Sequence, residues 1–186
     1  KPAKPKKPKA APVPPAPAAS EQYTTATPAP AWATDPPPKF WEQTDDVDMK
    51  LPAYPSGKVS TGVVMIEDGK IWVYEPKNHY GGYTTAFPKG QVESHLSPQQ
   101  NALKEVFEET GLHAKITGFL GDFGATTGTT RLYLGEKIGG NPTKFGSETW
   151  SVKLLTPDDL WKELVAQNQA YPLAAFQARH RAWLDD

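Results

Sequence analysis

The sequence contains no cysteine among its 186 residues, and it has no long apolar segment. The absence of cysteine excludes a disulfide-stabilised scaffold, a zinc site built from thiolates and a cysteine nucleophile. No stretch approaches the roughly 20 apolar residues that a helix needs to cross a bilayer, and the N-terminus lacks the apolar core of a secretory signal. We therefore expect a cytoplasmic protein without a membrane partner.

Proline is scarce in most of the chain but abundant at its start. Twelve of the 20 prolines fall in residues 1–38, which leaves eight for the other 148 residues. This difference predicts a Pro/Ala/Lys-rich arm or linker over residues 1–38 and one domain with C-terminal helices over residues 39–186. A domain of that length is large enough to bury a hydrophobic core.

The composition of the arm predicts disorder. A segment of Lys, Pro and Ala cannot bury enough apolar surface to offset its backbone entropy, and proline favours an extended, polyproline-II-like chain. Trp32 and the pair Phe40-Trp41 nevertheless indicate that the end of the arm docks on the domain. The first residue is Lys rather than Met, which suggests a processed chain or a piece of a longer one.

Charge is divided between the two parts. The arm carries five Lys against Glu21 and Asp35, a net charge of +3, so the overall charge of −1 leaves −4 on the remainder. The domain is therefore not a general nucleic-acid binder. Two interpretations of the arm stay open: a solvated linker, or a basic arm that contacts nucleic acid or another anionic surface weakly and without reading sequence.

The spacing of apolar residues predicts alternating strands and helices. Residues 58–66 and 70–74 form a hairpin signal, with Asp68-Gly69 at the turn. Ser97 suits a helix N-cap, followed by Pro98 and a capping Gln100, and Gly111 suits the C-terminal cap. The remaining predictions are strands at 84–87, 114–120, 131–138 and 148–155, and helices at 157–167 and 171–184. Together they indicate a mixed α/β sandwich.

The predicted helix after Ser97 carries three glutamates on one face. Glu105, Glu108 and Glu109 stand at positions i, i+3 and i+4, so their carboxylates lie within an arc of about 100°. Like charges at this spacing destabilise a helix unless they are neutralised. A hard divalent cation such as Mg²⁺ or Mn²⁺ prefers these oxygen ligands. A solvated acidic face is the alternative interpretation.

The segment Gly90–Leu112 resembles the Nudix hydrolase signature, which runs from a glycine through a first glutamate to an Arg-Glu-apolar-x-Glu-Glu-x-Gly-apolar end. Gly90 matches the first position, and the end of the pattern is matched by Glu105, Val106, Glu108, Glu109, Gly111 and Leu112. Phe87-Pro88-Lys89-Gly90 is also typical of the family. The resemblance implies a Nudix-type α/β/α sandwich with a mixed sheet over about residues 57–165.

Two positions depart from the Nudix pattern. Leu96 stands where the family has its first glutamate, and Lys104 stands where it has arginine. In the family these residues belong to the ion-pair network around the metal-binding glutamates, and lysine lacks the two-pronged hydrogen bonding of arginine. The departures bear on rate and metal affinity rather than on the fold. Glu93 lies in the same loop, but we do not count it as a replacement for Leu96.

The resemblance implies a hydrolase that depends on Mg²⁺ or Mn²⁺. Its substrate would be a small nucleotide in which a nucleoside diphosphate is linked to another moiety, such as a dinucleoside polyphosphate or ADP-ribose. Glu105 and Glu109 are the first candidates for metal ligands, with Glu108 next. The general base is open between Glu108 on the helix and Glu148 on a later loop, although Glu148 can also be a polar residue that precedes a strand.

Substrate contacts are assigned to three further residues, each with a plainer alternative. Lys89 is a candidate phosphate contact or a solvated loop lysine, and Arg131 is a candidate phosphate contact or a surface strand residue. Tyr83, like Tyr80 and Trp72, is a candidate for stacking on a base or a core residue. The alternative function is a catalytically weakened Nudix-fold module that binds nucleotides or a partner and is tethered by the arm.

Overall fold

The computed structural model describes residues 1–6, 18–79, 83–125, 127–167 and 177–182. Its helices are α1 (Phe40–Gln43), α2 (Pro98–Thr110) and α3 (Pro157–Ala166), and residues 177–182 are also helical. Its strands are β1 (Glu21–Tyr23), β2 (Val59–Glu67), β3 (Lys70–Pro76), β4 (Lys89–Gln91), β5 (Leu112–Ala125), β6 (Gly128–Gly140) and β7 (Thr149–Leu155).

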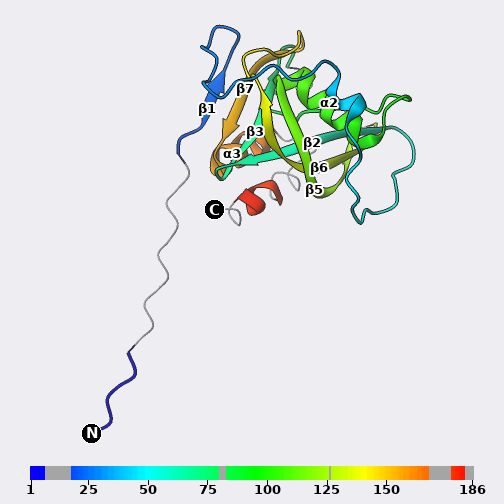
Figure 1. Ribbon diagram of the computed structural model, residues 1–186. Helices are drawn as coiled ribbons and strands as arrows, with labels where there is room; N and C mark the ends of the chain where they lie inside the picture. Colours follow the sequence, from blue (N-terminus) through cyan, green and yellow to red (C-terminus); the bar gives the residue numbers. More distant parts are fainter. Residues whose placement is uncertain (7–17, 80–82, 126, 168–176, 183–186) are drawn as a thin grey trace.

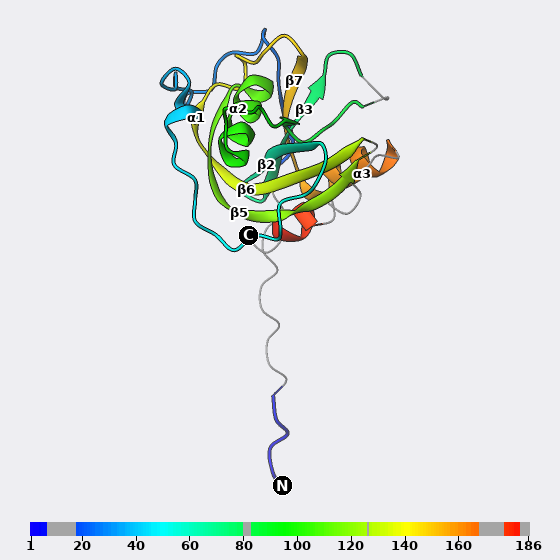
Figure 2. The same cartoon turned by 90° about the vertical axis from the view of Figure 1, so that its right-hand side faces the viewer.

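The strands form one mixed sheet between two helical layers. Their order is β1-β7-β3-β2-β6-β5, with β4 paired to β2; β2 and β6 run parallel, and the other pairs are antiparallel. Helix α2 lies on one face and α3 on the other (Figures 1 and 2). Leu103 and Val106 of α2 belong to one buried core cluster and Leu160 and Leu164 of α3 to a second. The predicted α/β/α sandwich is confirmed.

The β2–β3 hairpin turns where the sequence predicted. Asp68 and Gly69 both adopt left-handed backbone conformations, with φ of 48° and 71°. A two-residue turn of this kind matches the right-handed twist of the strands beside it, and the Asp-Gly pair is well suited to it. The turn fixes the register of β3, whose residues approach α2 on one face and α3 on the other.

Helix α2 is bounded by the predicted caps. The Ser97 hydroxyl accepts a hydrogen bond from the Gln100 backbone N–H, and the Gln100 side chain accepts one from the Ser97 N–H, both at 3.1 Å. Gly111 ends the helix at φ 73°, where a Cβ atom would stand 2.1 Å from the Asn141 carbonyl oxygen. These two ends fix the rotational setting of the glutamates on the helix.

The later part of the predicted arm, from about Ser20, packs on the domain. Strand β1 pairs with the edge of β7, and Ser20 donates to the Asp159 carboxylate at 2.6 Å. Trp32 packs edge-on against Trp72, with ring centroids 6.3 Å apart. The packed part of the chain therefore begins near Ser20 rather than at residue 39, because a few aromatic and strand-forming residues outweigh an average composition rich in proline. The predicted docking at Phe40-Trp41 is confirmed, since both are buried.

Several element boundaries differ from the predictions. β5 and β6 are longer than expected because they pair along nearly their whole lengths, with register shifts that absorb extra residues. The predicted strand at 84–87 is reduced to one bridge between Ala86 and Tyr74. The helix predicted at 171–184 is described only over 177–182, where it is helical.

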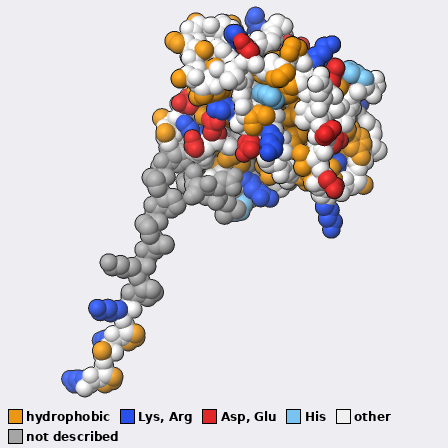
Figure 3. Space-filling model, viewed as in Figure 1, with side chains coloured by type: hydrophobic (Ala, Val, Ile, Leu, Met, Phe, Trp, Pro, Cys, Tyr) orange, Lys and Arg blue, Asp and Glu red, His pale blue; other side chains and the backbone are white. Residues whose placement is uncertain are grey.

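Figure 3 shows acidic and basic side chains interspersed on the visible face of the domain, and lysines on the described start of the arm. Within the described ranges, none of the helices combines the length and the apolar character needed to cross a membrane.

Candidate active site

A cavity of about 280 Å³ brings the predicted acidic residues together. It is lined by residues of α2 and of the loop before β7: Glu105, Glu108, Glu109, Gly146, Ser147 and Glu148. The three candidate metal ligands and both candidate bases therefore face one space. Sequence spacing predicted that the helical glutamates would share a face, but it could not show that Glu148, about 40 residues later, would join them.

Hydrogen bonds to the backbone of α2 hold the Glu148 loop beside the helix. The Gly146 N–H donates to the Glu108 carbonyl at 2.6 Å, and the Thr149 hydroxyl donates to the Glu109 carbonyl at 2.8 Å. On the outer side, the Lys77 N–H donates to the Glu148 carbonyl at 2.8 Å. These contacts fix the loop at both ends, so the exposed Glu148 side chain is held at the mouth of the cavity.

Gly90 occupies its position because a carboxylate lies directly against its Cα. A Cβ atom built at Gly90 would stand 2.1 Å from the Glu105 carboxyl carbon and within 2.4 Å of both its oxygens. Any other residue would push this carboxylate away. The first glycine of the signature thus has a steric role in this chain: it allows β4 to approach the acidic face of α2 closely.

Glu109 is the most deeply placed of the three helical glutamates, with 7% of its surface exposed. It accepts hydrogen bonds from the Lys89 backbone N–H, at 3.4 Å, and from the Tyr74 phenol, and its carboxyl group contacts that of Glu105. Burial, reinforced by the charge of Glu105, raises the pKa of Glu109 well above its ordinary value. Burial also raises the pKa of Glu105.

Tyr74 is a site residue that the sequence analysis missed. Burial, followed by the charge of Glu109, raises the pKa of its phenol, so it stays a hydrogen-bond donor. The signal was available in the alternation of β3, because Tyr74 is two residues from the fully buried Trp72 and so lies on the same face of the strand. That face points toward α2.

Lys104 bridges two carboxylates. Its ammonium nitrogen lies 2.7 Å from an oxygen of Glu93 and 3.0 Å from an oxygen of Glu108. Burial alone would lower the pKa of Lys104, but the hydrogen bonds to these glutamates together raise it. The same contact lowers the pKa of Glu93. Glu93 supplies the carboxylate that pairs with Lys104, the basic residue of the Nudix signature Gly90–Leu112, which is called the box below.

Leu96 does not leave a gap in the site. It is 7% exposed and belongs to the core cluster that includes Leu103 and Trp41. The position where the family pattern has its first glutamate is therefore used for packing. The ion pair to Lys104 comes instead from Glu93, three residues earlier in the same loop.

The donor set fits a hard divalent cation in its chemistry. The carboxyl groups of the buried Glu109 and the partly buried Glu105 are in contact and repel each other when both are ionised, and a dication with oxygen ligands removes that cost. In the part of the chain that the structure describes, however, no three acidic or histidine side chains are already gathered closely enough to form a metal-binding group. The residues thus match the ion by type and by their common cavity.

The candidate substrate contacts are dispersed. Lys89 lies on β4, with its backbone N–H directed at Glu109. Tyr83 is half-buried and does not line the cavity. Trp72 is fully buried, which confirms its interpretation as core, and Tyr80 lies outside the described residues.

Arg131 is not brought to the cavity. Its guanidinium donates to the Asp122 carboxylate at 2.8 and 2.9 Å and to the carbonyls of Pro52 and Ala53 at 3.1 and 3.2 Å. Only 2% of the residue is exposed, so its interpretation as a surface strand residue is wrong. In this structure Arg131 anchors the segment that leads into β2.

Comparison with known proteins identifies the family. The sequence model of the NUDIX domain matches residues 57–176. The chain belongs to the NUDIX family. A MutT-like protein from Streptomyces ambofaciens is 31% identical over 100 residues, an alignment that covers 53% of this chain and 63% of the relative. The match therefore spans less than two thirds of that protein.

Solved Nudix structures share the fold. An ADP-ribose pyrophosphatase from Streptococcus suis is 24% identical, with a TM-score of 0.55 over 68% of this chain and 93% of its own. A NUDIX hydrolase from Nitrosomonas europaea is 18% identical, with a TM-score of 0.58 over 68% and 90% of the two chains. The resemblance predicted from Gly90–Leu112 is confirmed. The roles of individual site residues in this Nudix domain stay predictions.

Proposed function

We propose that this Nudix domain is a pyrophosphohydrolase that uses Mg²⁺ or Mn²⁺ to cleave the diphosphate linkage of a small nucleotide derivative. The cavity shared by the three glutamates of the box and Glu148 is the observation that carries the proposal. Membership of the NUDIX family supports it, as do relatives named as a MutT-like protein and an ADP-ribose pyrophosphatase.

Glu105 and Glu109 are the proposed metal ligands, with Glu108 as the next candidate. A dication bound there would neutralise phosphate oxygens and lower the pKa of a bound water. The Tyr74 phenol and the Lys89 N–H orient the Glu109 carboxylate through their hydrogen bonds. Gly90 lets β4 lie against Glu105, and Lys89 on that strand is the proposed point charge for a substrate phosphate.

The proposed reaction forms a bond between the oxygen of water and phosphorus, and breaks the anhydride bond to the leaving phosphate. The proton of the water passes to a carboxylate at the cavity, Glu108 or Glu148. Lys104 lies 3.0 Å from one oxygen of Glu108 and so already occupies that oxygen, whereas Glu148 is exposed on the loop before β7. We therefore favour Glu148 as the acceptor, and Tyr83 stays a candidate for contact with the nucleoside.

A substrate screen tests this proposal. Purified protein is incubated with Mg²⁺ or Mn²⁺ and a panel of dinucleoside polyphosphates, ADP-ribose, nucleotide sugars, nucleoside triphosphates and inositol pyrophosphates. We expect metal-dependent release of a nucleoside monophosphate from at least one nucleotide. Absence of product from the whole panel, with both metals and folded protein, would contradict the proposal.

A second candidate is a Nudix module that binds nucleotides with little turnover. Leu96 favours it, because the position of the first box glutamate is committed to the core. Calorimetry that shows nucleotide binding without Mg²⁺, together with no turnover in the screen, would support it. In a weakened enzyme Lys104→Arg should raise kcat, whereas Leu96→Glu should only unfold the core, since it places a carboxylate at a site that is 7% exposed.

The lysine-rich start of the chain is a candidate contact for nucleic acid or for an anionic surface. A truncation that tests it has to stop before Ser20, because Ser20 contacts Asp159 and the following strand pairs with β7. We expect removal of residues 1–17 to leave turnover unchanged. If affinity for duplex DNA at low salt is also unchanged, the arm has no nucleic-acid role.

A further inference from the structure

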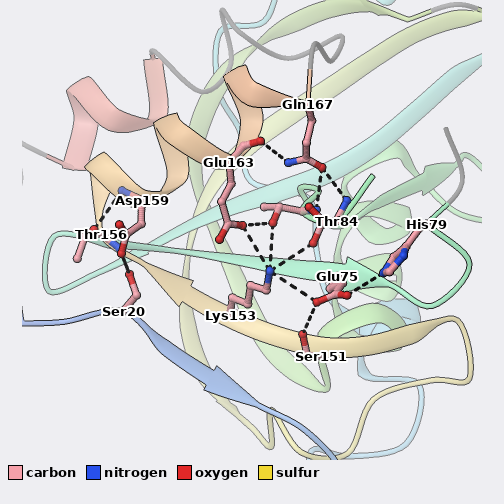
Figure 4. Close-up of polar contacts among 11 residues, drawn as sticks. Ser20, Glu75, His79, Thr84, Ser151, Lys153, Thr156, Asp159, Glu163 and Gln167 are labelled. Carbon is pink, nitrogen blue, oxygen red and sulfur yellow. Dashed lines mark hydrogen bonds and ion pairs between the residues drawn. The ribbon is translucent and has the colours of Figure 1, made fainter. Parts of the chain in front are cut away.

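A second polar cluster lies on the other face of β3 from the acidic cavity. Its centre is the ammonium group of Lys153 on β7, whose side chain is 13% exposed. The nitrogen lies 3.6 Å from a carboxylate oxygen of Glu75 on β3 and 3.4 Å from one of Glu163 on α3. Figure 4 shows these side chains converging from the two strands and the helix. The cation occupies the space between the carboxylates, so the cluster is not a second cation site.

The same cluster holds two consecutive residues of the segment between β3 and β4. Lys153 donates to the Thr84 carbonyl and to the Thr85 hydroxyl, each at 3.4 Å. The Thr85 hydroxyl donates in turn to the Glu163 carboxylate. Gln167, at the C-cap of α3, accepts from the Thr84 N–H at 2.6 Å and from the Thr85 N–H at 3.2 Å (Figure 4). Glu163 of α3 thus binds the side chain of Thr85, and Gln167 at the C-cap of α3 binds the backbone of Thr84 and Thr85, which lie outside the strands.

This segment leads directly to the hydrogen-bond partners of Glu109. Ala86, the next residue, exchanges two backbone hydrogen bonds with Tyr74, at 2.9 and 3.0 Å. Tyr74 donates its phenol to Glu109. Three residues after Ala86, the Lys89 N–H also donates to Glu109. The segment held by α3 therefore leads to both hydrogen-bond donors of Glu109. Ala86 pairs with Tyr74 on β3, and Lys89 is itself the second donor.

We propose that Lys153, Glu163 and Gln167 are positioning residues that fix the segment from Thr84 to Gly90 against the acidic cavity, so that α3 sets the geometry of the metal-binding carboxylates. The inference rests on the proposed function of the cavity. Within this segment, Thr85 makes the most direct contact with the positioning residues, because its buried hydroxyl is bonded to both Lys153 and Glu163. None of these residues touches the cavity.

Matched substitutions at Thr85 test the proposal. Thr85→Val keeps the shape of the side chain and removes the hydroxyl, whereas Thr85→Ser keeps the hydroxyl. We expect Thr85→Val to weaken Mn²⁺ binding, measured without substrate, by about threefold to tenfold and to lower kcat more than it changes KM. Thr85→Ser should restore both. Gln167→Leu should act in the same direction, and Lys162→Met, at an exposed position of α3, is the control.

Two further measurements keep the outcome decisive. Hydrogen exchange at the Ala86 and Lys89 amides should accelerate in Thr85→Val and Gln167→Leu at unchanged global stability. If both folded variants keep wild-type Mn²⁺ affinity, kcat and amide protection, or lose only thermal stability, the proposal is overturned. If wild-type protein binds no Mn²⁺ and turns over no substrate, the proposed function fails, while the amide exchange still decides whether α3 positions the segment.

Discussion

Tyr74 and Glu75 are neighbours on β3, yet they belong to polar clusters of opposite character. On the Tyr74 side, the buried carboxyl group of Glu109 contacts that of the partly buried Glu105. On the Glu75 side, Lys153 stands between two carboxylates, within 3.6 Å of each. The first arrangement costs folding free energy unless a ligand neutralises it, and the second is complete by itself. The candidate site and the Lys153 cluster thus differ in charge compensation: the site brings two carboxyl groups into contact, whereas the carboxylates of the cluster have Lys153 between them.

The largest expected effect comes from removing one charge of the uncompensated cluster. Glu109→Gln should reduce kcat by about a hundredfold or more, because it removes a proposed metal ligand, and it should leave the unfolding free energy unchanged or higher. Steady-state turnover with Mn²⁺ and urea unfolding measure the two quantities. Retained activity would contradict the role of Glu109, and a large stability loss would show that this carboxylate belongs to the architecture.

The compensated cluster should respond in the opposite way. Lys153→Met leaves Glu75 and Glu163 facing each other without their cation, and it should lower the unfolding free energy by about 2 kcal/mol. Denaturant unfolding measures this, with Lys162→Met on the exposed side of α3 as the matched control. If Lys153→Met were as stable as the control, the contrast between the two clusters would be wrong.

The dependence of stability on pH sharpens the same contrast. In the unfolded chain Glu109 returns to a pKa near 4.5, whereas burial and the charge of Glu105 raise its pKa in the folded protein. Between these values the folded state binds more protons. The protonation of Glu109 therefore contributes fully to the stability of the folded protein below about pH 4.5. This contribution is lost as the pH rises through the folded-state pKa of Glu109.

Metal-free protein should accordingly lose unfolding free energy, relative to Glu109→Gln, as the pH rises above about 4.5, because the folded-state pKa of Glu109 is raised. Urea unfolding at several pH values measures the difference between the two proteins, which cancels the other titrating groups. Saturating Mn²⁺ should reverse the trend, because it binds the ionised carboxylates. A difference that does not vary with pH would mean that Glu109 titrates normally in the folded state.

How far the sequence predicts this molecule depends on how local the determining contacts are. The caps of α2 and the turn at Asp68-Gly69 involve residues close together in the chain, and both were predicted. The alternation of β3 could have placed Tyr74 on the same face as Trp72, but its hydrogen bond to Glu109 depends on how β3 packs against α2. Arg131 looked available from its position in the strand, but its partners Pro52 and Ala53 are almost 80 residues away.

The substituted position in the box shows the same limit. Leu96 could be recognised as a departure from the pattern, but its burial depends on the core around α2. That Glu93 reaches Lys104 depends on the path of the loop between β4 and the helix. Composition failed for residues 20–38 for a related reason: the few side chains that dock them, such as Trp32, are outnumbered by prolines and alanines.

The smallest expected effect concerns the ion pair at the edge of the cavity. Glu93→Gln frees Lys104 to bond more fully to Glu108, and it should weaken Mn²⁺ binding by about threefold, since exposed ion pairs contribute at most about 1 kcal/mol. Calorimetric titration with Mn²⁺ measures it, with Glu136→Gln as a control at an exposed carboxylate of β6.

Lys104→Met separates positioning from simple charge. If Lys104 acts only as a positive charge, its removal should strengthen Mn²⁺ binding, because a cation 3.0 Å from Glu108 repels the metal. If the bridge from Glu93 holds Glu108 in place, the same substitution should weaken binding. Weaker binding in both variants would make Glu93 the functional counterpart of the box glutamate that Leu96 replaces. Tighter binding in Lys104→Met would instead mean that the positive charge of Lys104 lowers the metal affinity of the site.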